Sequence, residues 1–285
     1  IYPLFVVDGQ QKQEPIPSMP GAYRYSVDTL LQEVEQALSL GLRTFILFPA
    51  VEDQLKDETA SYSYHPDNFY LKAIQSIKQQ FPEACVVTDV AMDPYSSDGH
   101  DGLVRDGQVV NDDTLPILAK MALAQADAGA DILGPSDMMD GRVGYIRDAL
   151  DSRGHQQVSI MAYTAKYATA YYGPFRDALA SAPEGGSKAD YQMDPANQRE
   201  ALEEAHLDYQ EGADYLMVKP ALHYLDVIYR LNETFHIPIA AYHVSGEYAM
   251  LKAAAQQGWL NYNETIAESL LSIRRAGARA ILTYA

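Results

Sequence analysis

A lysine stands directly after a short apolar stretch of this sequence. Residues 215–218 are all apolar, and Lys219 and Pro220 follow them. An unbroken apolar run is typical of a parallel strand covered on both faces, and a proline ends the strand pairing. An ammonium group in this place loses hydration unless another group compensates. Lys219 therefore either pairs with a carboxylate at a rim, or is a catalytic amine of lowered pKa that forms a Schiff base with a carbonyl group.

Further polar residues are expected at the carboxyl ends of other strands, where they bear on this choice. The third expected strand ends in Asp89 and continues into Asp93, Asp98 and Asp101. The other strand ends carry Ser136 and Asp137 (fourth), Lys166 (fifth), Tyr242 and Ser245 (seventh) and Tyr284 (eighth). Two ammonium groups on adjacent strand ends disfavour each other's charge, so one can be a free amine near neutral pH. A structural lysine pair would need matching acids, which only the aspartates could supply. The pairing of Lys166 with Lys219 favours the catalytic interpretation.

The segments that must position these residues alternate between short apolar runs, typical of buried strands, and stretches in which apolar residues recur with the period of a helix. Eight short apolar runs predict strands: 4–7, 44–49, 85–91, 131–134, 158–163, 214–218, 238–244 and 280–284. Helix-like segments separate them, which predicts an α/β fold and, from the count, a closed (β/α)8 TIM barrel in a single domain, residues 1–285. A doubly wound open sheet is the alternative, but no strand precedes a G-x-G-x-x-G phosphate loop.

Local signals mark several helix boundaries. An apolar stripe over 27–38 follows Ser26, which is expected to cap that helix. Asp194 and Pro195 are expected to begin another helix, which Gly212 ends. The same glycine junction between helix and strand recurs at 128–133, 211–216 and 276–281. The chain begins without Met and stops at the eighth strand, so we expect an amino-terminal arm and a last helix to be missing.

The composition excludes several classes of function. The 285 residues are 47% hydrophobic and carry a net charge of −18, which argues against a nucleic acid or an anionic membrane surface as the main partner. Cys85 is the single cysteine, so no intramolecular disulfide can form and a reducing compartment is expected. No apolar run approaches the roughly 20 residues of a membrane span. We expect a cytoplasmic protein, or one of the plastid stroma if the source is a photosynthetic eukaryote.

Several long motifs resemble the porphobilinogen synthase (5-aminolevulinate dehydratase) family over nearly the whole chain. They are VTDVAMDPYSSDGHDG (87–102), GPSDMMDGRV (134–143), AKYATAYYGPFRDA (165–178), YQMDP (191–195), MVKP (217–220), VSGE (244–247) and PIPSMPG (15–21). The resemblance implies a (β/α)8 barrel that condenses two 5-aminolevulinate molecules into porphobilinogen, with loss of two waters, in tetrapyrrole and haem biosynthesis.

The resemblance also implies roles for individual residues. Lys219 matches the Schiff-base lysine for the substrate that supplies the propionate side, and Lys166 matches the lysine for the acetate side. A protonated imine is an electron sink that acidifies the carbon to be made nucleophilic. Holding both substrates in one site replaces a collision between free molecules by a reaction between oriented groups. This lowers the activation free energy by up to roughly 7–11 kcal/mol.

Other positions match residues that hold the substrates. Arg176 and Lys188, with Gln192 beside them, match the clamp for the acetate-side carboxylate, within a segment 172–192 that is expected to form a lid. Ser245 and Tyr284 match the residues that bind the propionate-side carboxylate. The remaining candidate substrate-binding residues are Asp89, Ser136, Tyr172 and Tyr242.

The loop after the third strand bears on the metal requirement. Zinc-dependent members of the family carry three cysteines where this chain has Ala91, Asp93 and Asp101. Carboxylates suit magnesium or a monovalent cation better than zinc, so no active-site zinc is expected. The loop resembles the aspartate-rich type of plants and many bacteria. Asp89 is the acid expected to interact with the lysines.

A second metal site and an assembly are implied as well. Glu204 matches a glutamate that binds an allosteric Mg²⁺, mostly through waters, and an exposed helix glutamate is an equally good description from sequence alone. Family members are usually homo-octamers. Two alternatives remain: a Schiff-base aldolase, which needs one imine lysine rather than two, and a non-catalytic protein that keeps the barrel.

Overall fold

Eight parallel strands in chain order form the centre of the molecule. The computed structural model describes residues 1–179 and 187–285, and in these ranges the strands of the central ring are β1 (Tyr2–Val6), β4 (Thr44–Pro49), β5 (Cys85–Val90), β8 (Ile132–Pro135), β9 (Ser159–Lys166), β10 (Tyr215–Lys219), β11 (Ile239–Tyr242) and β12 (Ala280–Leu282). Each is parallel to its neighbours in the sheet. All eight strands predicted from apolar runs are present.

The sheet curls until its first and last central strands meet. The amino group of Ile1 donates to the carbonyl of Ile281 at 2.9 Å, and the amide of Thr283 donates to the carbonyl of Ile1 at 3.3 Å. A small hairpin, β2 (Gln13–Pro15) with β3 (Tyr23–Tyr25), extends the sheet from the other end of β1 to ten strands. This hairpin lies outside the eight strands predicted from the apolar runs. The curled sheet is consistent with the predicted (β/α)8 barrel.

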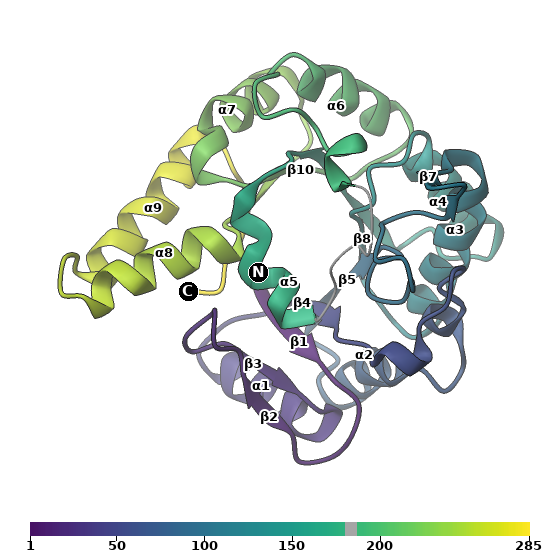
Figure 1. The fold of residues 1–285 in the computed structure, drawn as a ribbon, viewed down its shortest axis with the longest axis horizontal. Coiled ribbons are helices and arrows are strands. Elements are labelled where there is room, and N and C mark those ends of the chain that lie inside the picture. The colour runs from purple at the N-terminus through teal and green to yellow at the C-terminus, as the bar shows by residue number, and fades with distance from the viewer. Residues whose placement is uncertain (180–186) are drawn as a thin grey trace.

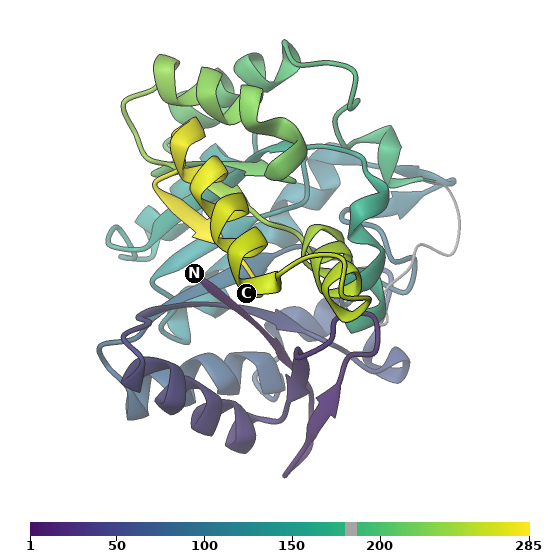
Figure 2. The ribbon, with the colours of Figure 1, turned by 90° about the vertical axis from the view of Figure 1, so that its left-hand side faces the viewer.

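Helices surround the strands on the outside of the ring (Figure 1). Those of the described ranges are α1 (Val27–Ser39), α2 (Phe69–Gln80), α3 (Asn111–Asp127), α4 (Arg142–Ser152), α5 (Gly173–Leu179), α6 (Glu200–Gln210), α7 (Leu225–Thr234), α8 (Ser245–Gln256) and α9 (Tyr262–Ala276). α8 and α9 together connect β11 to β12 and lie side by side near both chain ends (Figure 2). The short α5 instead lies over the face of the ring that Figure 1 presents. None of the described helices is long and apolar enough to cross a membrane.

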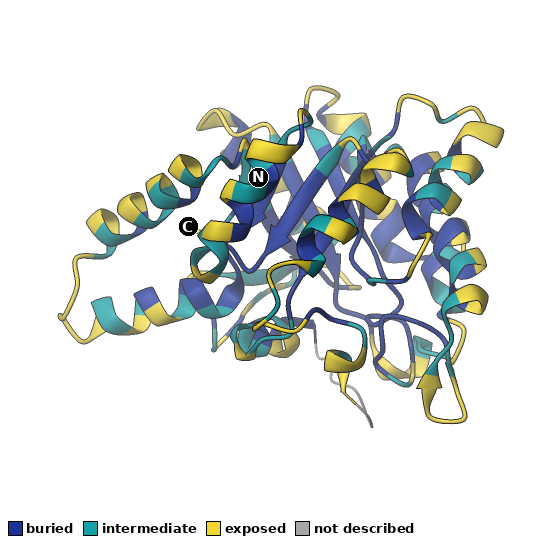
Figure 3. Cartoon of the chain, turned by 90° about the horizontal axis from the view of Figure 1, so that it is seen from above, coloured by how far each residue is buried: buried dark blue, intermediate teal, exposed yellow. Residues whose placement is uncertain are grey.

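Side chains along each strand point alternately to the outside and the inside of the ring, which produces two separate hydrophobic cores. In β1, Leu4 and Val6 pack outward against the helices, whereas Phe5 packs inside the ring. Phe48, Met161 and other alternate residues fill the interior with Phe5. The strands are therefore buried on both faces and the outer faces of the helices are exposed (Figure 3).

Most local boundary predictions are confirmed, with two corrections. Gly129, Gly212 and Gly277 have φ of +104°, +99° and +123°, as the repeated helix-to-strand junction requires. α6 begins at Glu200 and not at Pro195, because Asp194 accepts from Ala196 in a turn and Asn197 accepts the first amides of the helix. Ser26 occupies the N-cap of α1, but its hydroxyl accepts from the Lys12 amide instead of capping the helix.

Candidate active site

The two lysines are register partners on neighbouring strands. Lys219 at the end of β10 lies opposite Lys166 at the end of β9. The strand register shifts shortly before the two lysines: Leu216 pairs with Ala162, but Val218 pairs with Ala165. This bulge inserts one residue into β9, so that Lys166 faces the interior like Tyr163 instead of alternating outward. Both lysines are only 6% exposed and share one edge of the ring.

Aromatic rings surround the amine of Lys219. Its Nζ lies 4.8 Å from the ring centre of Tyr242, 4.9 Å from Tyr172, 5.1 Å from Phe175 and 5.2 Å from Tyr163. Among the described residues it makes no ion pair. Burial and the nearby Lys166 ammonium lower the pKa of Lys219 to about 7. Its amine is thus a nucleophile near neutral pH.

Lys166 is in a polar environment instead. Its Nζ donates to the carbonyl oxygen of Ser136 and lies 3.3 Å from Asp101 Oδ2. The other oxygen of Asp101 lies 2.9 Å from Lys188 Nζ, which also contacts Asp93 at 2.9 Å. Burial opposes ionisation of Asp101, but Lys166 and Lys188 outweigh it and hold the pKa of that carboxyl well below its usual range. A charged network therefore lies beside the apolar cage of Lys219.

Asp101 forms the direct ion pair with Lys166, whereas Asp89, the acid expected to interact with the lysines, interacts with both of them through its charge. Asp89 is buried at the end of β5, where its amide donates to the Tyr70 hydroxyl at 3.2 Å and its carbonyl accepts from Gln125 at 2.9 Å. Burial and the charge of Asp93 raise the pKa of Asp89 to about 7. Asp89 makes no ion pair among the described residues, yet the charges of both site lysines act on it. Its intermediate pKa suits a group that exchanges protons.

The residues matched to the propionate side are hydrogen-bonded to the aromatic cage of Lys219. The hydroxyls of Tyr242 and Tyr284 are 2.6 Å apart, and both side chains are buried. Ser245 Oγ accepts from the amide of Phe175 at 3.0 Å. Phe175 and Tyr163 also belong to this wall, although neither was predicted as a site residue. Phe175 lies next to Arg176 in a quoted motif, and Tyr163 occupies an inward position of β9, but nothing local indicated that either faces Lys219.

The residues matched to the acetate side are not assembled into a clamp. Arg176 is exposed on α5 and makes no ion pair within residues 1–179 and 187–285. Lys188 is occupied by Asp93 and Asp101, and Gln192 is 7% exposed nearby in the chain. Residues 180–186 of the expected lid lie outside the described residues.

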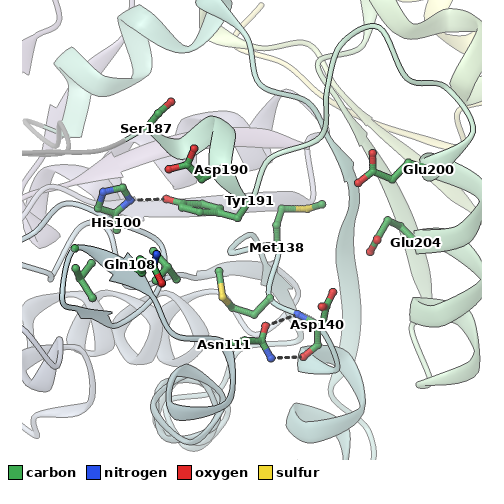
Figure 4. Close-up of a pocket in the computed structure, with 14 residues that line it drawn as sticks. His100, Gln108, Asn111, Met138, Asp140, Ser187, Asp190, Tyr191, Glu200 and Glu204 are labelled. Atoms are coloured by element: carbon green, nitrogen blue, oxygen red, sulfur yellow. Dashed lines mark hydrogen bonds between the residues drawn. The ribbon is translucent and has the colours of Figure 1, made fainter.

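Glu204, the expected magnesium ligand, lies away from the lysines on α6. It lines a cavity of about 490 Å³ together with Glu200, Asp140, His100 and Tyr191. Figure 4 shows the two glutamates on one wall, with the hydrogen-bonded pair of His100 and Tyr191 across the cavity. Burial, reinforced by neighbouring acids, raises the pKa of Glu204 to about 7. No group of three His, Cys, Asp or Glu side chains suited to a metal occurs in the part of the chain that the structure describes.

A buried ion-pair triad links this region to the strand ends. Arg142 is 2% exposed and lies 3.2 Å from Asp208 Oδ1 and 3.7 Å from Asp137 Oδ1. It also donates to the carbonyl of Tyr163 at 3.3 Å. Asp137 directly follows Ser136, whose carbonyl accepts from Lys166. The triad therefore connects α4 and α6 to the chain that surrounds both lysines.

Two buried lysines lie side by side at the carboxyl ends of parallel strands, one of them in an aromatic cage, so the site belongs to the class of amine-bearing pockets at the strand ends of a curled α/β sheet. The family model for delta-aminolevulinic acid dehydratase matches residues 1–285. The chloroplastic enzyme of that name from Physcomitrium patens is 57% identical, over all of this chain and 66% of its own length. The Bradyrhizobium diazoefficiens enzyme is 53% identical, over all of this chain and 81% of its own length.

A solved structure agrees with these sequence relatives. The Toxoplasma gondii delta-aminolevulinic acid dehydratase, in complex with the reaction product porphobilinogen, superposes with a TM-score of 0.98 at 54% identity. The match covers 99% of this chain and 81% of that one. The chain belongs to the delta-aminolevulinic acid dehydratase (porphobilinogen synthase) family. Its resemblance to that family, read from the motifs, is confirmed.

Proposed function

We propose that this chain condenses two molecules of 5-aminolevulinate to porphobilinogen, with loss of two waters, through Schiff bases at Lys219 and Lys166. The observation that carries the proposal is the register pairing of two buried lysines in contrasting environments. An aldolase that uses one imine lysine has no need of the second.

Lys219 binds the propionate-side substrate in this mechanism. Its neutral amine attacks the ketone, and water leaves as the imine forms. The surrounding rings exclude bulk water, which protects the imine from hydrolysis. Ser245 and Tyr284 hold the carboxylate of this substrate, and Tyr172 and Tyr242 pack against its carbon chain.

Lys166 forms the second imine, on the acetate-side substrate, with release of the second water. Asp101 stabilises the positive charge of the protonated imine. Loss of a proton from the carbon beside it gives an enamine, which forms the carbon–carbon bond. The enamine carbon attacks the imine carbon on Lys219, and the Lys219 amine is then eliminated. The amino group of the propionate-side substrate attacks the imine carbon on Lys166 and displaces that lysine, and loss of a proton completes the pyrrole, so both amines are regenerated and the two waters lost are those of imine formation. Asp89 and the Ser136 hydroxyl are the nearest candidates for carrying protons.

Binding of the acetate-side carboxylate requires a rearrangement. Lys188 is held by Asp93 and Asp101, so it must leave at least one of them to join Arg176 and Gln192 as a clamp. A substrate carboxylate would replace one aspartate as the counter-ion of Lys188. The number of negative charges around this ammonium group would therefore stay nearly the same. This is the closure that the expected lid, 172–192, would perform.

The proposal also includes a magnesium site at Glu204 and an assembly of several subunits. A bound Mg²⁺ at Glu204 would neutralise the acidic wall of the cavity, and one carboxylate with waters is a coordination that Mg²⁺ accepts. Asp93 and Asp101 are the second place for a magnesium or monovalent cation, and no zinc is expected there. We further propose one domain over 1–285, a homo-octamer as the assembled form, and a location in the bacterial cytoplasm or the plastid stroma.

The test is to incubate the protein with 5-aminolevulinate and measure porphobilinogen by its pyrrole absorbance after colour formation and by NMR. Borohydride added with substrate should attach it covalently to Lys219, located by peptide mass spectrometry. The Lys219→Ala variant should form no product. Labelling confined to exposed lysines such as Lys72, with no pyrrole formed, would refute the proposal.

A further inference from the structure

A carboxylate that the mechanism does not use is completely buried beside the loops that follow β10 and β11. Glu247, in the first turn of α8, is 0% exposed. Its Oε1 accepts from the amide of Leu222 at 2.8 Å, and its Oε2 accepts from the amide of Val244 at 2.9 Å. Leu222 lies three residues after Lys219, and Val244 directly precedes Ser245. One side chain therefore joins the loops that follow β10 and β11.

The same turn of α8 supports the segment that covers Lys219. Ser245 Oγ accepts from the amide of Phe175 and donates to the carbonyl of Tyr171 at 3.3 Å. At Gly246, an added Cβ would lie 2.5 Å from the carbonyl oxygen of Tyr171 and 2.7 Å from its Cα. The backbone of this segment thus rests directly on the helix end, at a distance that only glycine allows.

His223 contacts both Glu247 and the segment that contains Tyr171. Its Nδ1 lies 3.5 Å from Glu247 Oε1, and its Nε2 lies 3.0 Å from the hydroxyl of Tyr171. The Tyr171 and His223 rings also stack, with centres 4.5 Å apart. The loop after Lys219, the first turn of α8 and the segment before α5 are therefore tied to one another through Glu247.

From this geometry we propose that Glu247 is a positioning residue for the Lys219 half of the site. Its two oxygens set the spacing between the loop after Lys219 and the Ser245 turn, and that turn holds Tyr172 and Phe175 over the amine. The inference rests on the proposed Schiff base at Lys219. The plainer interpretation is a buried helix cap that contributes only stability.

The decisive variant is Glu247→Gln, which keeps the shape but replaces one acceptor oxygen by an NH₂ group that faces a backbone N–H. Borohydride trapping of 5-aminolevulinate on Lys219 should slow about 10-fold, the lower end of the loss found when an outer partner of a metal ligand is removed. The pH midpoint of trapping should also rise, because a loosened cage admits water to the amine. A cap that contributes only stability would change neither quantity at temperatures where the variant stays folded.

Asp214→Asn is the matched control. Asp214 Oδ2 accepts from the amide of Ile160 at 2.8 Å, so it joins β10 to β9 at their opposite, amino-terminal ends. This variant also loses a bond between carboxylate and backbone, but its trapping rate and pH midpoint should equal those of the parent. A slowdown in Glu247→Gln no larger than in Asp214→Asn would overturn the inference.

Gly246→Ala provides a second, independent variant, because its methyl group must push the Tyr171 backbone away. It should repeat the slower trapping and the raised midpoint while Glu247 stays intact. If Glu247→Gln does not fold, Gly246→Ala decides alone, and parent-like trapping then overturns the inference. An unmodified protein that forms no porphobilinogen would refute the proposed function and this inference together. An active parent with unaffected variants would refute only the inference.

Discussion

The two lysines at the centre of the site differ in what surrounds them. Four aromatic rings enclose the amine of Lys219, whereas Lys166 contacts a carboxylate and a carbonyl oxygen. The environments separate two tasks of a Schiff-base enzyme. A desolvated amine attacks a ketone readily, and a charged imine requires a nearby anion.

The pH dependence of imine formation should follow the amine of Lys219. Burial and Lys166 lower the pKa of this amine to about 7, and only its neutral form attacks the ketone. The trapping rate at Lys219 should therefore rise as pH increases through about 7 and then level off. Rapid-quench borohydride trapping across the pH range measures this. A rate that keeps rising toward pH 10, the usual range for lysine, would contradict the prediction.

At the scale of elements, the triad that joins α4 and α6 to the strand ends should matter for stability. Asp208→Ala leaves the buried Arg142 guanidinium with Asp137, at 3.7 Å, as its one remaining ion-pair partner among the described residues. Removing one partner of a buried ion pair costs about 3–5 kcal/mol of unfolding free energy. Urea denaturation of the variant and the parent measures the loss.

The control for this prediction lies on the same helix. Glu203→Ala alters an exposed glutamate of α6 and should change the unfolding free energy by less than about 0.5 kcal/mol. Equal losses in the two variants would show that the triad contributes nothing beyond the helix itself.

The loop after β5 should make the enzyme independent of zinc. Asp93 and Asp101 occupy this loop, and both pair with ammonium groups. Carboxylates hold zinc less well than thiolates do, so a zinc-specific chelator should leave the rate of porphobilinogen formation unchanged. EDTA should lower the rate only to the extent that magnesium matters. An activity lost on zinc removal and restored by zinc alone would disprove this.

At the scale of the whole molecule, magnesium at Glu204 should act indirectly. Glu204 lies on α6, outside the ring, whereas the lysines face its interior. Magnesium should raise activity by favouring the assembly in which the lid closes, and substrate should in turn tighten magnesium binding, because the coupling is reciprocal. Glu204→Ala should remove the stimulation but leave trapping at Lys219 intact.

Steady-state rates over a magnesium titration, with light scattering at each concentration, test this coupling. Glu200→Ala on the same wall is the comparison, since it removes a neighbouring charge but not the proposed ligand. If Glu204→Ala keeps the half-saturating magnesium concentration of the parent, the metal binds elsewhere, and the loop with Asp93 and Asp101 becomes the next candidate.

Much of this architecture follows from local features of the sequence. Each apolar run is a strand, and the repeated glycine junctions have the positive φ that was expected. Strand period and turn chemistry are properties of a few adjacent residues, so they can be read without knowing the fold. Lys166 and Lys219 could be placed on adjacent strand ends for the same reason.

Tertiary structure alone decided how these groups face and pair. The bulge that turns Lys166 inward depends on the register of β9 against β10, which no local pattern encodes. The direct ion pair of Asp101 with Lys166 joins residues 65 apart in sequence and depends on how the intervening loop folds back. Glu247 was likewise invisible as more than a helix residue, since its two bonds reach the ends of two other strands. Contacts between distant segments depend on how the whole ring packs. They therefore cannot be read from any short stretch of the sequence.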